Sequence, residues 1–281
     1  MMSSSFSLIE LFFNPFFVMA LLGGIGSSIA GGVVGSYVVT KRIVFISGSI
    51  SHAVLGGMGI ALFLRRTFDL AWLEPIYGAL FFAIISALLI GIIHLYYKER
   101  EDTVIASLWT SGMAVGVIFL SLTPGYNVEV LNFLFGNILW TSSKDLWVLF
   151  SLDALIFTLI YFYHRKFLAI CFDERQAQLQ GLHVKSLYFL LLSLVAVTVV
   201  LLIQVVGVIL VIAILTLPAA IANLWTQKFS NMMVLGAIFG VIFNFLGMIF
   251  SFYLNWPPGS TISLTATVGY FLSLALKNQR Q

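Results

Sequence analysis

Long apolar stretches make up most of this chain, and short polar segments between them hold nearly all of the charged residues. Two of these stretches, 186–227 and 229–276, contain no charged side chain at all. Four shorter stretches are equally free of charge: 11–40, 43–64, 75–97 and 103–128. A helix needs about 20 apolar residues to cross the hydrocarbon core of a membrane. In lipid only helices and closed barrels satisfy the backbone, and these runs lack the alternation of barrel strands. The pattern therefore predicts an all-α fold, a polytopic membrane helix bundle.

The same pattern gives the candidate membrane spans. They are 12–39, 47–64, 75–97, 103–122, 146–163, 186–205, 208–225, 231–253 and 261–276. The apolar segment 130–143 is shorter, which is typical of an interfacial or half-membrane helix. Span 208–225 contains Pro218, and proline removes a helix hydrogen bond and kinks the axis. We therefore expect eight or nine spans, with Gly207 and Pro218 as candidate positions for a helix break or a gate; a static kink is the alternative.

The first span is rich in small residues at a spacing of four. They occur at 27, 31 and 35 and again at 28, 32 and 36. In lipid, such faces let helix backbones approach closely, so we expect this span in the interior of the protein.

Composition and charge agree with a membrane protein. Hydrophobic residues make up 60% of the chain and charged residues 9%, and the mean hydropathy is +1.06. Cytoplasmic loops are enriched in Lys and Arg. With the N-terminus outside, 11 of the 14 basic residues fall in cytoplasmic segments: Lys41, Arg42, Lys98, Arg100, Arg165, Lys166, Arg175, Lys185, Lys228, Lys277 and Arg280. These loops account for the net charge of +3. The sequence has no basic stripe with interleaved aromatic residues, so nucleic-acid binding is not predicted.

The N-terminal residues lack the basic region of a cleavable signal peptide.

A polar segment at the start of the second span carries the first candidate chemistry. Ser47 and Ser51 share one helical face, and Gly48 and His52 share the next. His52 is expected at least one turn inside the membrane, where ionisable side chains are costly and usually face a cavity. Because neutral imidazole is a common metal ligand, His52 is a candidate ligand on a cation path. The alternative is a histidine that hydrogen-bonds between helices.

The longest polar stretch, 164–185, is expected on the cytoplasmic side. Within it, residues 172–181 are predicted to form a short amphipathic helix that ends at a glycine. A solvated loop would also explain the composition, but a compact helix between two spans is a surface that a soluble partner could bind. The chain contains no Gly-Lys pair and hence no phosphate-binding loop of the Gly-Lys-Ser/Thr type, so we expect no ATP hydrolysis by this chain alone.

Several motifs occur in order along nearly the whole chain. They are a glycine-rich first helix that runs into Lys41-Arg42, then Ser51-His52-Ala53-Val54-Leu55-Gly56-Gly57, then Leu134-Phe135-Gly136-Asn137-Ile138-Leu139, then Phe172-Asp173-Glu174 with Ala177 and Gly181, and last Gly207 through Leu217-Pro218-Ala219-Ala220. In this combination the chain resembles the integral membrane subunits of the ABC-3 family, the zinc, manganese and iron permeases of bacterial ABC importers.

The resemblance implies a type II ABC importer permease fold in a single domain, 1–281, in the bacterial cytoplasmic (inner) membrane. It implies a homodimer of permeases, two cytoplasmic ABC ATPase subunits and an extracytoplasmic metal-binding protein, so that the chain itself is no enzyme. No permanently bound cofactor is expected, only the transported divalent ion. The resemblance places His52 on the metal path. It assigns 172–181 to the coupling helix that binds the ATPase, with these coupling residues: Phe172, Asp173, Glu174, Ala177 and Gly181.

One position departs from the family pattern. Many members have an aspartate four residues before the histidine, where this chain has Gly48. In that pattern the two side chains share a helical face and can share a cation. Here Ser47, Ser49, Ser51, Asn132 or a water molecule would complete the site. Because the hard carboxylate is missing, we expect zinc, which accepts imidazole, ahead of manganese or iron.

Asp153 is a further candidate on the cation path, because it is the only acidic residue well inside a predicted span. Pairing with Lys144 or with a backbone donor is the alternative.

The main competing function is a secondary metal-ion carrier or channel without an ATPase partner. Such carriers usually keep several intramembrane carboxylates or histidines, and here only Asp153 and His52 qualify. A membrane-embedded enzyme is disfavoured because the metalloprotease motif His-Glu-x-x-His and a Ser/His/Asp set are both absent.

Overall fold

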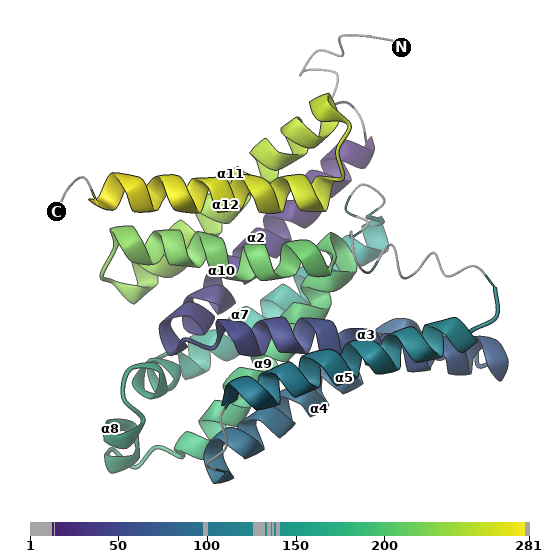
Figure 1. Ribbon diagram of the computed structural model, residues 1–281. Helices are drawn as coiled ribbons and strands as arrows, with labels where there is room; N and C mark the ends of the chain where they lie inside the picture. Colours follow the sequence, from purple (N-terminus) through teal and green to yellow (C-terminus); the bar gives the residue numbers. More distant parts are fainter. Residues whose placement is uncertain are drawn as a thin grey trace.

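The computed structural model describes residues 13, 15–97, 101–125, 133, 136, 138 and 141–278. Its elements are helices, and no strand occurs among these residues. In chain order they are α2 (Pro15–Lys41), α3 (Val44–Thr67), α4 (Pro75–Tyr96), α5 (Glu101–Leu122), α7 (Ser143–Phe172), α8 (Glu174–Leu179), α9 (Val184–Val206), α10 (Val208–Trp225), α11 (Phe229–Leu254) and α12 (Pro258–Asn278) (Figure 1). The expected short helix over 130–143 falls mostly outside the described residues.

Every described helix except α8 is long and apolar enough to cross a membrane, which gives 9 candidate spans in the described part of the chain. Each matches one predicted span, so the all-α polytopic fold is confirmed. The span with Pro218 is one continuous helix of 18 residues, long enough to cross. Helix α7 is longer than predicted, with 30 residues. It starts at a capping box formed by Ser142 and Asp145.

Helix α2 lies inside the bundle and packs against α7, α9, α10 and α11. Both predicted small-residue faces make close contacts. A Cβ added at Gly31 or Gly35 would meet the backbone carbonyl of Ile214 or Leu215 on α10, and a Cβ added at Gly32 would overlap the backbone of α11. Glycine at these positions therefore lets the backbones of three membrane helices touch.

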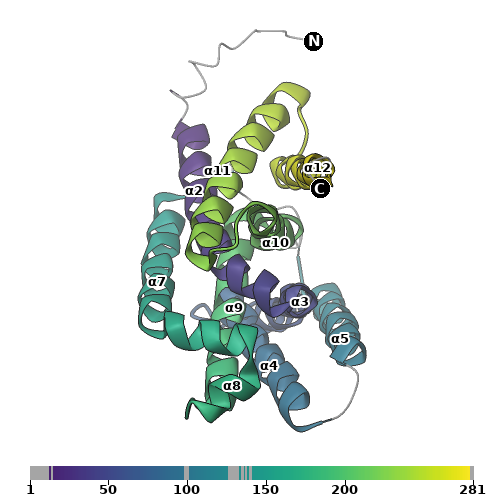
Figure 2. The same cartoon turned by 90° about the vertical axis from the view of Figure 1, so that its left-hand side faces the viewer.

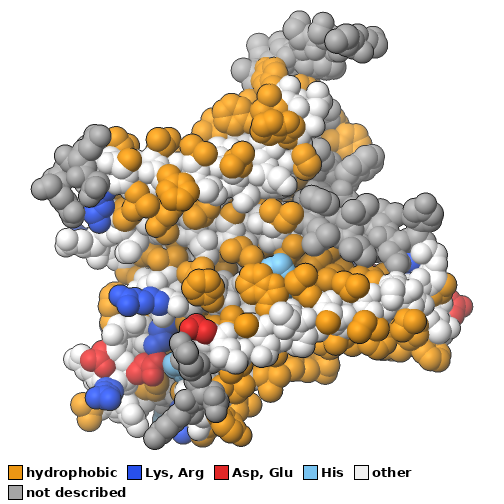
Figure 3. Space-filling model, in the orientation of Figure 1, with side chains coloured by type: hydrophobic (Ala, Val, Ile, Leu, Met, Phe, Trp, Pro, Cys, Tyr) orange, Lys and Arg blue, Asp and Glu red, His pale blue; other side chains and the backbone are white. Residues whose placement is uncertain are grey.

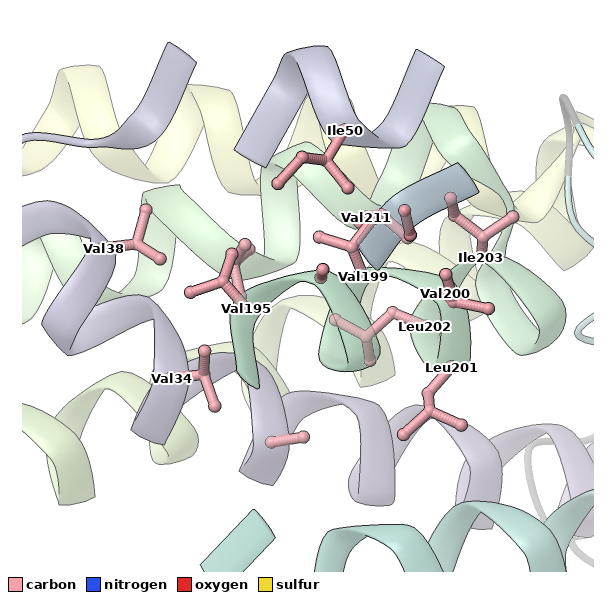
Figure 4. Close-up of a cluster of buried hydrophobic side chains, with 14 of the residues drawn as sticks. Val34, Val38, Ile50, Val195, Val199, Val200, Leu201, Leu202, Ile203 and Val211 are labelled. Atoms are coloured by element: carbon pink, nitrogen blue, oxygen red, sulfur yellow. The ribbon is translucent and has the colours of Figure 1, made fainter. Parts of the chain in front are cut away.

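The buried apolar core gathers around α9. Figure 4 shows Val34 and Val38 of α2 pointing toward Val195 of α9, with Ile50 of α3 and Val211 of α10 on the other side of the same cluster. Dense packing matters here because lipid chains are as apolar as these side chains, so van der Waals contact supplies much of the stabilisation.

Helix α3 is held between α4 and α5 by further glycine contacts. A Cβ at Gly57 would overlap the carbonyl oxygen of Gly78 on α4, and a Cβ at Gly112 of α5 would lie 2.5 Å from the Cα of Ala53 on α3. Figures 1 and 2 show these three helices side by side, on the side of the bundle away from α11 and α12. The segment that carries His52 is therefore packed closely against α5, and the helix continues in close contact with α4.

Basic side chains gather at one end of the helices. Figure 3 shows Lys and Arg side chains at the end where α8 lies, which we term the α8 end, and a broad apolar surface along the helices. This distribution is the one that the positive-inside rule describes for the cytoplasmic end of a membrane protein.

We predict that Gly57→Ala destabilises the protein by about 1–3 kcal/mol, the usual range for overpacking. The matched control is Gly48→Ala in the same helix, because a Cβ at Gly48 would have its nearest neighbour at 3.7 Å, an ordinary contact. Thermal unfolding of the purified protein in detergent measures both variants. Equal unfolding temperatures for the two variants would contradict the close contact between α3 and α4.

Candidate functional site

His52 lies on α3 and stacks on Trp109 of α5. The two ring centroids are 4.2 Å apart and the rings are inclined by 13°. One turn earlier on the same face, a Cβ at Gly48 would lie 3.7 Å from Trp109 and 3.9 Å from Ile212 of α10. The half-buried His52 side chain thus lies where α3, α5 and α10 come together.

The serines beside His52 are buried and hydrogen-bonded. Ser47 Oγ donates to the carbonyl of Val44 at 2.8 Å, and Ser51 Oγ donates to the carbonyl of Ser47 at 2.8 Å. Ser49 Oγ donates across to the carbonyl of Ile105 on α5, at 2.9 Å. The hydroxyl protons are used in these bonds. The bond from Ser49 holds α3 to α5 and so fixes the stack of His52 on Trp109.

The structure does not bring Asp153 to His52. Asp153 is buried on α7, which packs mainly against α2 and α9, whereas His52 contacts α5. Figure 2 shows α7 and α5 on opposite sides of the bundle. The carboxylate oxygen Oδ1 of Asp153 has no hydrogen-bond partner among the described residues. The two side chains are therefore not neighbours, and a role for Asp153 on a cation path stays a prediction.

The remaining predicted ligand, Asn132, lies outside the described residues. Within the described residues there is no group of three or more His, Cys, Asp or Glu side chains that could hold a metal ion. Of the predicted path residues, His52, Ser47 and Ser51 lie on adjacent turns of α3, and His52 is the strongest metal ligand among them.

The short helix predicted within 172–181 is present as α8, and it ends at a glycine as expected. Asp173 caps α8, because its carboxylate accepts a hydrogen bond from the backbone N–H of Gln176 at 3.0 Å. At the other end Gly181 has φ +79, a backbone conformation that favours glycine. The N–H groups of Gly181 and Leu182 bond to the carbonyls of Gln178 and Ala177, which is a Schellman motif.

The exposed surface of this segment differs from the prediction at one position. Ala177 is only 1% exposed and packs inward, so it is not available to a partner. Phe172 is 71% exposed and Leu179 is 88% exposed. These two apolar side chains, at the last residue of α7 and the last residue of α8, are the accessible apolar surface of the segment.

Glu174 faces the ends of two membrane helices. Its carboxylate forms an ion pair with Lys41, the last residue of α2, and lies 3.9 Å from Nε2 of His94 on α4. Lys41 also donates to the carbonyl of Ile170 at 2.8 Å. The ring of His94 stacks on Tyr188 of α9, with centroids 4.7 Å apart. The first residue of α8 is thus tied to the ends of α2 and α4.

Gly207 joins α9 to α10 as a single linking residue with φ +80. A Cβ at Gly136 would overlap the carbonyl of Val206, so Gly136 lies directly against this junction. Farther along α10, Pro218 leaves the carbonyl of Ile214 without its usual helical donor. Gly31 of α2 lies against that carbonyl. The predicted break is therefore a tight junction at Gly207 followed by a helix that stays continuous through Pro218.

The sequence profile of the ABC 3 transport family matches residues 14–277. The chain belongs to the ABC 3 transport family. It is 46% identical over 271 residues to a probable metal transport system membrane protein of Chlamydia muridarum, covering 96% of this chain and 92% of that relative. It is 33% identical over 258 residues to the manganese transport system membrane protein MntC of Listeria monocytogenes, covering 92% and 89% of the two chains.

Solved structures share the fold of this ABC 3 protein. A chain of PsaBC from Streptococcus pneumoniae, solved in complex with a Fab, superposes with a TM-score of 0.83 at 30% identity and 95% coverage of both chains. A chain of a metal-chelate type ABC transporter in an inward-facing conformation superposes with a TM-score of 0.73. That chain is 14% identical, and the superposition covers 97% of this chain and 91% of the other, so it shows the fold alone. Together these matches confirm the permease fold expected from the resemblance.

Sequence reasoning missed three residues of the ABC 3 protein that the structure makes prominent. Trp109 lies in a span with several Ser and Thr residues, which was the available signal that α5 is not an ordinary lipid-facing helix. For Leu179 the available signal was its apolar side chain within a polar segment. Lys41 stood out only as a basic residue at the end of a span, and its partner Glu174 is more than a hundred positions away in sequence.

We predict that Lys41→Glu speeds amide hydrogen exchange in α8, and that adding Glu174→Lys to this variant restores the original exchange rate. A charge-assisted bond contributes about 1.5–3 kcal/mol, so amide hydrogens of residues 176–182 should exchange about tenfold faster in the single variant. Hydrogen exchange of the full chain in detergent measures this, with Lys228→Glu at the same end as the control. If the single variant exchanges like the control, the ion pair does not hold α8.

Proposed function

We propose that this chain is the permease subunit of an ATP-driven importer of divalent transition metal ions in the bacterial cytoplasmic membrane. Residues 1–281 form one permease domain, two copies form the pathway, and separate ABC ATPase subunits and an extracytoplasmic metal-binding protein complete the system. Family membership, relatives named as metal transport membrane proteins and the α8 segment support this proposal. The observation that carries it is the intramembrane His52 at the meeting point of α3, α5 and α10.

One imidazole per copy is too few ligands for a dehydrated divalent ion, because such an ion needs replacement ligands in a low-dielectric path. A second copy of the chain would supply a second set of ligands. We place that copy against α5, whose exposed face carries Ser107, Thr110 and Ser111. Small and hydroxyl side chains on a membrane helix are typical of helix contacts rather than of lipid contact. This arrangement would put Trp109 and His52 beside the partner.

Coupling would run through contacts that connect α8 to His52. Phe172 and Leu179 would bind the ATPase, and a shift of α8 would act on α2 through the pair of Glu174 and Lys41. Glycines of α2 lie on α10 at Ile214 and Leu215. Helix α10 in turn reaches the His52 site. A rigid element with two positions is what such transmission requires.

Two metals are favoured by different observations. The MntC relatives are named as manganese transport proteins. The donor set here offers imidazole and no carboxylate at position 48, which favours zinc. A divalent transition metal is the proposal that both observations share.

We predict that His52→Ala lowers metal uptake by about tenfold or more, since even groups outside the ligand shell change metal affinity by 10- to 100-fold. Uptake of zinc, manganese and iron into cells or vesicles with the assembled system measures this. His183→Ala, exposed at the start of α9, is the matched control. Normal uptake by a folded His52→Ala protein would show that the histidine only packs against Trp109.

We predict that Gly48→Asp raises the ratio of manganese to zinc uptake. A Cβ at position 48 would make only ordinary contacts, and a carboxylate oxygen is a ligand that manganese prefers more than zinc does. Gly48→Asn is the control, because it has nearly the same size without the charge. An unchanged metal ratio in the aspartate variant, with total uptake intact, would remove position 48 from the metal path.

We predict that Phe172→Asp combined with Leu179→Asp abolishes co-purification of the ATPase subunit, because burying unpaired charge in an interface costs several kcal/mol. Both residues are exposed, so the permease itself should unfold at the wild-type temperature. Asn223→Asp with Gln227→Asp, exposed at the α8 end, is the control. If the first double variant retains the ATPase and transports metal, α8 is a solvated loop, and a carrier without an ATPase partner becomes the better explanation.

A further inference from the structure

A large lateral groove lies between α2, α7 and α11, away from the His52 site. Its volume is about 980 Å³. The walls are apolar along most of their length, with Ile29 and Val33 from α2, Phe157 and Ile160 from α7, and Val234 and Ile238 from α11. Val234 and Ile238 are also exposed, so the groove is open to the side. In a membrane protein this opening faces the acyl chains of the bilayer.

One end of the groove is polar. His164, Arg165 and Lys166 of α7 and Ser230 of α11 line it at the α8 end. His164 is fixed by a 2.5 Å hydrogen bond between its Nδ1 and the hydroxyl of Tyr37 on α2. Lys166 Nζ lies 5.1 Å from the ring centroid of Tyr163. Among the described residues neither Arg165 nor Lys166 has an acidic partner, so two cationic groups are available at the mouth of an apolar groove.

We infer that this groove binds one anionic phospholipid from the leaflet on the α8 side. The acyl chain occupies the apolar length between α7 and α11, and the phosphate lies against Arg165 and Lys166 with Ser230 as a hydroxyl donor. Basic pockets between membrane helices at the cytoplasmic side are suited to anionic headgroups. A free anion would leave the apolar length empty, and a zwitterionic lipid would bring its own quaternary ammonium cation beside the two basic side chains. The combination of the two features therefore selects a charged lipid.

The groove is separate from the surface assigned to the second copy. Its helices α7 and α11 lie on the other side of the bundle from α5, where the second copy is placed (Figure 2). The bound lipid would contact α2 beside Tyr37 and bridge α7 to α11, and in this way it would stabilise the helices that carry the coupling segment. The inference uses only the membrane location and the groove, so it holds or fails independently of which metal is moved.

The test compares phosphatidylglycerol with phosphatidylcholine of the same acyl chains, added to the delipidated full chain in detergent. Native mass spectrometry measures bound lipid, and thermal unfolding measures stabilisation. We expect one tightly bound phosphatidylglycerol and a dissociation constant about tenfold lower than that of phosphatidylcholine, since each basic residue near an anionic surface adds to binding. Arg165→Gln with Lys166→Gln should abolish this preference, and Lys228→Gln with Lys277→Gln should keep it.

A second variant separates the two features of the groove. Val234→Trp keeps both cations and fills the apolar part from an exposed position, so it should weaken phosphatidylglycerol binding without changing unfolding in lipid-free detergent. Three results would overturn the inference. They are equal binding of the two lipids by the unmodified protein, an equal loss of preference in the Lys228 and Lys277 control, and equal stabilisation by inorganic phosphate alone.

Discussion

Direct contact between helix backbones, made possible by glycine, is the constraint on which the rest of this structure depends. Lipid offers no hydrophobic gain for bringing helices together, so close van der Waals approach has to supply the stabilisation. Helix α2 meets α10 through Gly31 and Gly35 and α11 through Gly32, and α3 meets α4 through Gly57. Any Cβ at the closest of these positions would overlap a neighbouring backbone. The bundle therefore has little freedom in how its central helices are placed.

Through these contacts and an ion pair, α2 is connected both to α8 and to α10. At the α8 end, Lys41 forms an ion pair with Glu174 of α8, and deeper in the membrane α2 lies against α10 next to Pro218. Helix α10 borders the space beside Gly48 and His52 through Ile212. Because these backbones are in contact, a shift of one helix has to be followed by the next. The proposed coupling of ATP hydrolysis to the metal path needs no additional element in this chain.

The sequence predicted the spans, the packing faces of α2 and the glycine-ended α8, because hydropathy, small-residue spacing and capping are local patterns. It could not predict the neighbours of a residue. Asp153 is buried, as its position well inside an apolar span predicted. Its helix α7 nevertheless places it away from His52. Ala177 and Leu179 lie two positions apart, and only their rotation about α8 decides that the first is buried and the second exposed. The ion pair of Lys41 with Glu174 depends on tertiary structure alone.

The central claim is that movement of α8 reaches the His52 site through α2. The most direct measurement is the rate at which a thiol reagent labels Gly48→Cys in the assembled importer, in a Cys171→Ser background, with and without ATP. The account predicts that the labelling rate changes with nucleotide and that Lys41→Gln abolishes the change while the ATPase stays bound. A rate that does not respond to nucleotide, or a response that survives Lys41→Gln unchanged, would contradict it.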